Sequence, residues 1–120
     1  MKNVVVIGAG TMGNGIAHVF AMNGFHTTIV DISETALQKA VATINKNLDR
    51  MVSKSVLSEL QKSETLSNLH TNNSIENAVI HADLIVEAAT ENIDFKLNIF
   101  RTLENFALTK AILATNTSSL

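Results

Sequence analysis

Short apolar runs alternate with longer amphipathic segments along the whole chain. The first run, Val4-Val5-Val6-Ile7, is entirely β-branched, which is typical of a strand buried on both faces of a parallel sheet. Further strands are predicted at the short runs 27–30, 69–72, 84–86 and 111–114. Helical segments separate these runs, and this alternation indicates an α/β fold with a doubly wound, mostly parallel sheet.

Apolar residues at three- and four-residue spacing predict the helices. The longest stripe follows Ser33, a residue type that caps helices, and consists of Leu37, Ala40, Val41, Ile44, Leu48 and Met51. The pattern leaves open whether this helix continues or restarts after residues 53–55. Ser74 is expected to cap a short helix over 75–81, and a wide apolar face predicts another helix over 93–107.

A complete G-x-G-x-x-G motif, Gly8-Ala9-Gly10-Thr11-Met12-Gly13, joins the first strand to the first helix. Gly8 permits the tight turn, Gly10 lets the backbone approach a pyrophosphate, and Gly13 lets the helix pack against the strand. The amino end of the helix offers N–H groups to the phosphates. The motif therefore predicts dinucleotide binding; the alternative is a glycine turn that merely joins two elements.

Asp31 lies eighteen residues after Gly13, at the carboxyl end of the second predicted strand. A carboxylate there can accept hydrogen bonds from both ribose hydroxyls of an adenosine. Its charge would repel a 2′-phosphate, and Ile32 and Ser33 supply no arginine to receive one, so NAD is favoured over NADP. Asp31 also suits the amino end of the next helix, and the two roles are compatible.

Composition narrows the function classes. The 120 residues make one domain with a net charge of −2, so nothing suggests nucleic acid, and no apolar stretch is long enough to span a membrane. The absence of cysteine excludes disulfides and thiolate metal sites and is compatible with the cytoplasm. The four histidines, His18, His26, His70 and His81, share no metal-ligand spacing, and no metal is expected.

Two polar segments, 89–92 and 116–119, follow the fourth and fifth predicted strands. Ligands bind beyond the carboxyl ends of the strands in such a sheet, so both segments are expected near the nicotinamide and its substrate. The alternative for the second segment is an ordinary polar loop. The lysines on the long helix are interpreted, from spacing alone, as a solvated face.

Several of these segments together resemble a known family. They are Val6 to Ala17, Asp31, Leu84 to Ala88 with Glu91-Asn92 and Lys96, and Asn116-Thr117-Ser118-Ser119-Leu120. Their order and sequence resemble the Rossmann-like NAD-binding domain of 3-hydroxyacyl-CoA dehydrogenases, and the bacterial 3-hydroxybutyryl-CoA dehydrogenases look nearest. The resemblance covers residues 1–120. It implies NAD-dependent interconversion of a 3-hydroxyacyl-CoA and its 3-oxoacyl-CoA.

The resemblance also implies roles for individual residues. Those assigned to NAD are Gly8, Ala9, Gly10, Thr11, Met12, Gly13, Asp31, Ala89, Glu91, Lys96, Asn116 and Ser118. Lys54 matches the lysine for the CoA phosphates, and Asn47 stands where some members have a serine that touches CoA. Ser118 would contact both the nicotinamide and the 3-oxygen of the acyl-CoA substrate.

The family's catalytic base is a histidine oriented by a glutamate, and both lie beyond the Asn-Thr-Ser-Ser segment. A helical domain that forms a homodimer follows them. We therefore expect this chain to be the cofactor-binding half of an enzyme, incomplete at its carboxyl end and inactive alone. Two alternatives stay open: a stand-alone NAD(H)-binding module without catalysis, and a related β-hydroxyacid dehydrogenase that uses no CoA.

Overall fold

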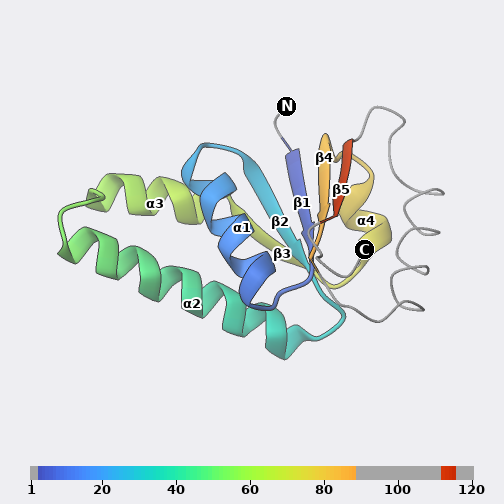
Figure 1. Cartoon of the computed structure of the whole chain (residues 1–120), viewed down its shortest axis with the longest axis horizontal. Coiled ribbons are helices and arrows are strands. Elements are labelled where there is room, and N and C mark those ends of the chain that lie inside the picture. Colours follow the sequence, from blue (N-terminus) through green and yellow to red (C-terminus); the bar gives the residue numbers. More distant parts are fainter. Residues whose placement is uncertain (1–2, 89–111, 116–120) are drawn as a thin grey trace.

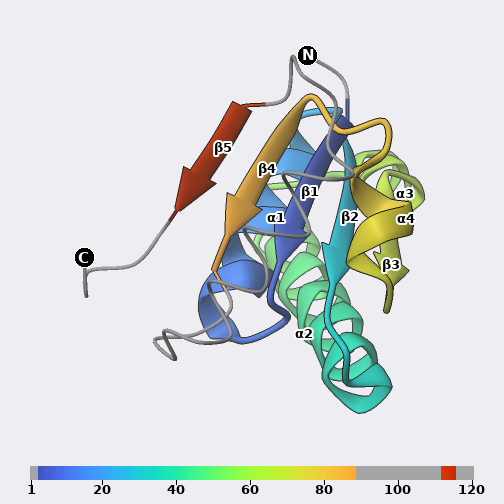
Figure 2. The same cartoon turned by 90° about the vertical axis from the view of Figure 1, so that its right-hand side faces the viewer.

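A computed structural model describes residues 3–88 and 112–115 of the chain. Its elements, in chain order, are β1 (Asn3–Ile7), α1 (Thr11–Met22), β2 (His26–Val30), α2 (Glu34–Ser53), α3 (Glu59–Ser67), β3 (Leu69–Asn72), α4 (Ile75–Val79), β4 (Leu84–Glu87) and β5 (Ile112–Thr115). The strands form one parallel sheet in the order β3-β2-β1-β4-β5 (Figures 1 and 2). The doubly wound parallel sheet predicted from the sequence is confirmed.

The predicted elements match the observed ones closely. Each of the five strands lies within one residue of its predicted bounds. The short helix after Ser74 ends at Val79, two residues before the predicted 81, and the predicted helix over 93–107 falls outside the described residues. Within the described part, no helix combines the length and the apolarity that crossing a bilayer requires.

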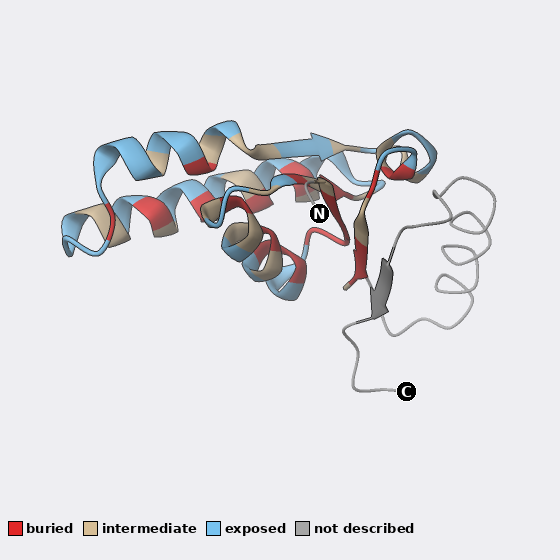
Figure 3. Cartoon of the chain, turned by 90° about the horizontal axis from the view of Figure 1, so that it is seen from above, coloured by how far each residue is buried: buried red, intermediate tan, exposed pale blue. Residues whose placement is uncertain are grey.

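Both faces of β1 are buried, as its unbroken apolar run predicts. Val4 and Val6 pack with α1 and α2 on one face, whereas Val5 and Ile7 pack with α4 on the other. All four side chains are at most 2% exposed. Figure 3 shows this buried centre between the helical layers. The carboxyl end of β1 is therefore rigidly held where the glycine motif begins.

The helices α2 and α3 form a hairpin that projects from the sheet (Figure 1), so the long helix restarts rather than continues. The α2 end is closed by two hydrogen bonds: Ser55 N–H donates to the Val52 carbonyl at 3.0 Å, and Val56 N–H donates to the Met51 carbonyl at 2.9 Å. This is a Schellman motif, and Ser55 occupies its left-handed position with φ 59°.

The start of α3 is fixed by a reciprocal pair of hydrogen bonds. The Ser58 hydroxyl accepts from Gln61 N–H, and the Gln61 side chain accepts from Ser58 N–H. This capping box is legible in the sequence as Ser-x-x-Gln. Lys62 of α3 pairs with Asp49 of α2, which joins the two arms of the hairpin.

We predict that Ser55→Gly stabilises the fold by about 0.5–1 kcal/mol, because glycine adopts the left-handed conformation without a Cβ clash. The neighbouring Ser53→Gly, inside the last turn of α2, should instead destabilise it by up to about 1 kcal/mol. Urea unfolding followed by circular dichroism measures both changes. Equal effects of the two variants would show that the hairpin turn carries no strain.

Two histidines stack near the amino ends of the neighbouring strands β2 and β3. The rings of His26 on β2 and His70 on β3 lie with their centroids 4.1 Å apart and their planes 17° from parallel. Partial burial lowers the pKa of His70 below its ordinary value of 6.5, and the adjacent His26 lowers that pKa further. The stacked pair therefore favours the neutral form of His70.

Stability should consequently fall as the solution becomes acidic. The folded state holds the His70 proton less tightly than the unfolded chain does, so the stabilisation present above about pH 6.5 is lost as pH falls through the lowered pKa. His26→Gln should reduce this loss by removing the neighbouring charge. Thermal unfolding between about pH 8 and pH 5 measures it; an unchanged pH slope in the variant would contradict the coupling.

Candidate functional site

The loop between β1 and α1 turns sharply at Gly8. This residue has φ 112°, a left-handed conformation that suits glycine, and its N–H donates to the Val30 carbonyl at 2.7 Å. The bond fixes the loop to the carboxyl end of β2. The sequence prediction that Gly8 permits the turn is consistent with this conformation.

Gly13 faces the turn at very close range. A Cβ added to Gly13 would lie 1.9 Å from the Gly8 carbonyl oxygen, which no side chain allows. A Cβ added to Gly10 would meet nothing within 4 Å, so the space above that residue is open. The two glycines thus serve different purposes: Gly13 allows the helix to pack, and Gly10 leaves room above the loop.

The amino end of α1 is available to an anion. Its N-cap, Gly10, provides no side-chain acceptor, and the first turn contains no acidic residue. The backbone hydrogen bonds of the helix begin with Asn14 N–H, which donates to the Gly10 carbonyl at 2.9 Å. Met12, in this first turn, is 53% exposed. Open N–H groups beneath open space are what a phosphate group needs.

The Asp31 carboxylate joins the loop between β1 and α1 to the loop between β2 and α2. Its Oδ2 accepts from Ala9 N–H at 3.1 Å and its Oδ1 accepts from Ser33 N–H at 2.9 Å. Ser33 in turn caps α2 by accepting from Ala36 N–H at 3.1 Å. Each carboxylate oxygen can accept a further hydrogen bond, so the structural bonds leave capacity for a ribose hydroxyl. The sequence did not reveal the bond to Ala9, because it depends on how the two loops meet.

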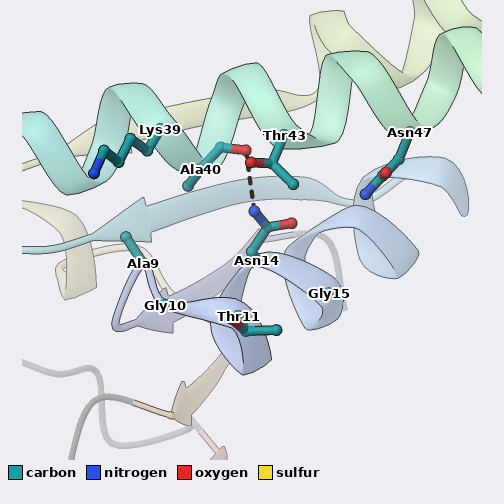
Figure 4. A pocket seen from close by; sticks show the side chains of 9 residues that line it. All are labelled: Ala9, Gly10, Thr11, Asn14, Gly15, Lys39, Ala40, Thr43 and Asn47. Carbon is teal, nitrogen blue, oxygen red and sulfur yellow. Dashed lines mark hydrogen bonds between the residues drawn. The ribbon is translucent and has the colours of Figure 1, made fainter.

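A groove of about 480 Å³ runs from the glycine loop along the interface of α1 and α2 (Figure 4). It is lined by Ala9, Gly10, Thr11, Asn14, Gly15, Lys39, Ala40, Thr43 and Asn47. The largely buried Asn14 crosses the interface, where its Nδ2 donates to the Ala40 carbonyl at 3.3 Å. The groove brings Asn47, predicted to touch CoA, together with the glycine loop; Lys54 is not among its lining residues.

Sequence reasoning missed three of the polar residues that line this groove. Lys39 was interpreted as part of a solvated helix face, Thr43 was not singled out, and Asn14 was named only as a position within the family motif. A signal existed: Lys39, Thr43 and Asn47 are separated by four residues each and therefore share one side of α2. Which side faces α1 could not be read from the spacing.

The remaining predicted site residues, Ala89, Glu91, Lys96, Asn116 and Ser118, lie outside the described residues. Glu87, at the carboxyl end of β4, is fully buried. Over residues 3–88 and 112–115, no three acidic or histidine side chains cluster as a metal ion would require.

The sequence of the chain is similar to that of known dehydrogenases. Residues 3–120 match the family described as 3-hydroxyacyl-CoA dehydrogenase, NAD binding domain. The chain is 42% identical to 3-hydroxybutyryl-CoA dehydrogenase of Bradyrhizobium diazoefficiens, over 100% of the chain and 41% of that protein. It is 39% identical to the mitochondrial hydroxyacyl-coenzyme A dehydrogenase of Rattus norvegicus, over 100% of the chain and 40% of that protein.

Solved structures agree with the sequence matches. The (S)-3-hydroxybutyryl-CoA dehydrogenase PaaH1 from Ralstonia eutropha superposes with a TM-score of 0.94 at 40% identity, over 100% of this chain and 42% of that one. The 3-hydroxybutyryl-CoA dehydrogenase from Escherichia coli superposes with a TM-score of 0.95 at 38% identity, over 99% and 25%. The chain spans about two fifths of the length of the curated relatives described above.

The glycines of the loop allow a matched test of this geometry. Gly13→Ala should destabilise the fold by about 2–3 kcal/mol or more, because the added methyl group meets the Gly8 backbone. Gly15→Ala, in the same helix with nothing within 4 Å, should stabilise it by about 0.5–1 kcal/mol through helix propensity. Urea unfolding measures both; a Gly13→Ala protein as stable as Gly15→Ala would disprove the close approach.

Proposed function

The chain belongs to the family of 3-hydroxyacyl-CoA dehydrogenase NAD-binding domains, and on this premise we propose that it forms the cofactor-binding half of such an enzyme. The reaction is the NAD-dependent oxidation of a 3-hydroxyacyl-CoA to the 3-oxoacyl-CoA, or the reverse reduction of a substrate such as acetoacetyl-CoA. The relatives named 3-hydroxybutyryl-CoA dehydrogenase support a short acyl chain.

The observation that carries this proposal is the fit of the glycine loop to a pyrophosphate. The open space above Gly10 adjoins the uncapped amino end of α1, where backbone N–H groups and the helix dipole favour negative charge. Asp31 stands at the end of the adjacent strand with lone pairs remaining for a ribose. These residues would hold the pyrophosphate and the adenosine ribose of an NAD molecule at the carboxyl edge of the sheet.

NAD supplies the hydride acceptor when it is bound. The described residues of the chain position the NAD. Gly8 and Gly13 set the shape of the glycine loop, and Gly10 leaves room for the pyrophosphate. The charge of Asp31 favours a ribose without a 2′-phosphate. Ala89, Glu91, Lys96, Asn116 and Ser118 are proposed to complete the nicotinamide end on the strength of the resemblance. Ser118 would also contact the substrate oxygen, which is where negative charge develops on reduction.

Proton transfer needs a separate group. A general base must lie within hydrogen-bond reach of the hydroxyl. His26 and His70 lie at the opposite, amino ends of their strands, and His18 contacts Met22 in the second half of α1. None of the four histidines lines the groove. The proposal therefore assigns the base to residues outside the described part.

An acyl-CoA substrate, a homodimer of the complete enzyme and a cytoplasmic location accompany this proposal. The acyl-CoA follows from the family and from Asn47 and Lys54. The dimer and the location stay predictions. A purely NAD(H)-binding module and a dehydrogenase that uses no CoA are the competing outcomes of the test below.

An NADH titration of the 120-residue chain tests the proposal. The chain contains no tryptophan or tyrosine, so changes in nicotinamide fluorescence report binding without interference. Gly10→Ala should weaken NADH binding about tenfold or more, because its methyl group enters the space that the pyrophosphate needs. The free energy of unfolding should change by less than about 1 kcal/mol, since that space holds no protein atoms.

NADPH provides the control for Asp31: the wild-type chain should bind it at least about tenfold more weakly than NADH. Acetoacetyl-CoA added after the titration distinguishes the remaining alternatives. Binding of NADH without its consumption agrees with a base located elsewhere. Failure of the wild-type chain to bind NADH, or equal binding of NADH by Gly10→Ala, would overturn the proposed function.

A further inference from the structure

Glu87 is an ionisable residue at the end of an otherwise apolar strand. It is the last residue of β4, its side chain is fully buried, and its register partner on β1 is Ile7. Because side chains alternate along a strand, Glu87 lies on the same face of the sheet as Ile85, the face on which α4 packs. The preceding residues of β4 are all aliphatic, so an aliphatic residue would be the ordinary choice at this position as well.

Burial of this carboxyl group requires compensation. A carboxylate taken out of water loses its hydration, and only hydrogen bonds or an opposite charge offset that loss. Every buried side-chain oxygen or nitrogen of the described residues has a hydrogen-bond partner, and Glu87 is among the residues with such an interaction. A buried polar group with its hydrogen bonds complete favours one arrangement of the surrounding backbone over others. Glu87 is therefore suited to fix the end of β4 in one position.

The end of β4 lies in the middle of the edge that carries the site. The strands β1, β4 and β5 lie side by side with their carboxyl ends together (Figure 2). Glu87 pairs in register with Ile7, which directly precedes the glycine loop, and with Thr115, the last residue of β5. One residue further, Ala88 N–H donates to the Ile7 carbonyl at 2.9 Å. The end of β4 is thus bonded directly to the strand that positions the glycine loop.

The order of the strands gives the direction of the cofactor. Asp31, proposed for the adenosine ribose, follows β2, and the glycine loop, proposed for the pyrophosphate, follows β1. The sheet order β3-β2-β1-β4-β5 places β4 next to β1 on the side away from β2. A cofactor that crosses from β2 to β1 therefore continues over β4, and its nicotinamide half is expected beyond the end of that strand.

We propose that Glu87 is a positioning residue for the nicotinamide half of the bound cofactor. This inference rests on the proposed function, which supplies the cofactor. The side chain is fully buried and therefore acts through the backbone rather than by touching the cofactor. It holds the end of β4 beside β1, so that the chain leaving β4 meets the nicotinamide in one fixed position. The adenosine half, held by Asp31 and the glycine loop, does not depend on it.

Titrations of the 120-residue chain with NADH and with ADP-ribose test this role. ADP-ribose contains the adenosine and the pyrophosphate but no nicotinamide, so it reports the half of the site that Glu87 does not position. Glu87→Gln keeps the shape of the side chain and removes its charge. It should weaken NADH binding about three- to tenfold, comparable to the net worth of one hydrogen bond, and leave ADP-ribose binding within about 1.5-fold of wild type.

Asp83→Asn is the matched control, because it makes the same change of a carboxylate to an amide at the other end of β4. Asp83 directly precedes the strand, and its Oδ2 accepts from Asn3 N–H at 2.9 Å, so it also joins β4 to β1. It does so at the amino end of the sheet, away from the glycine loop. The ratio of NADH affinity to ADP-ribose affinity should stay within about 1.5-fold of wild type, even where the urea midpoint of unfolding falls.

Hydrogen exchange of the wild-type chain gives a second measurement that needs no variant. The Ala88 amide, bonded to the Ile7 carbonyl, reports the end of β4. Saturating NADH should slow its exchange more than saturating ADP-ribose does, because only NADH carries the nicotinamide that the end of β4 is proposed to position. Equal protection by the two ligands would contradict the proposal, whether or not Glu87→Gln folds.

The outcomes separate this inference from the proposed function. A wild-type chain that binds neither NADH nor ADP-ribose would overturn the proposed function. Binding of both ligands with an unchanged affinity ratio in Glu87→Gln would reject the role of Glu87 and leave the cofactor site standing. A ratio that falls as far in Asp83→Asn as in Glu87→Gln would also reject that role, because the effect would then belong to either carboxylate of the strand.

Discussion

The first turn of α1 lies so close to the glycine loop that only a residue without a side chain fits at Gly13. This backbone contact sets the distance between the helix and the carboxyl end of β1, and it brings the open N–H groups of the helix over the edge of the sheet. Next to this contact, a Cβ added to Gly10 would meet nothing within 4 Å, so the loop has open space there. Dinucleotide binding therefore requires that Gly13 has no side chain, although Gly13 need not touch the ligand.

Asp31, which is proposed to bind the ribose, also holds the surrounding loops together. Its two oxygens accept N–H groups from the glycine loop and from the start of α2, so one carboxylate joins the three elements that meet at the site. Such bonds orient the carboxylate before any ligand arrives, and preorganisation of this kind lowers the entropy lost on binding. Loss of the carboxylate would thus change the loop as well as the proposed ribose contact.

The sequence was sufficient to predict the parts of the fold that local patterns determine. The apolar run of β1, the caps Ser33 and Ser74 and the polar residues of β3 all lead to elements with nearly the observed bounds. The glycine motif likewise predicts the loop between β1 and α1. Local patterns do not specify which sides of two helices face each other, so the bond between Asn14 and Ala40 and the groove around it emerged only from the structure.

The position of α2 explains why its polar face matters. Asn14 holds α2 to α1 through a single carbonyl, and the residues beside this contact, Gly15 and Ala40, are small. Larger side chains there would fill the space between the helices, and the polar residues of α2 would then line a flat surface rather than a groove. The small residues at this contact and the polar residues of α2 therefore form the groove together.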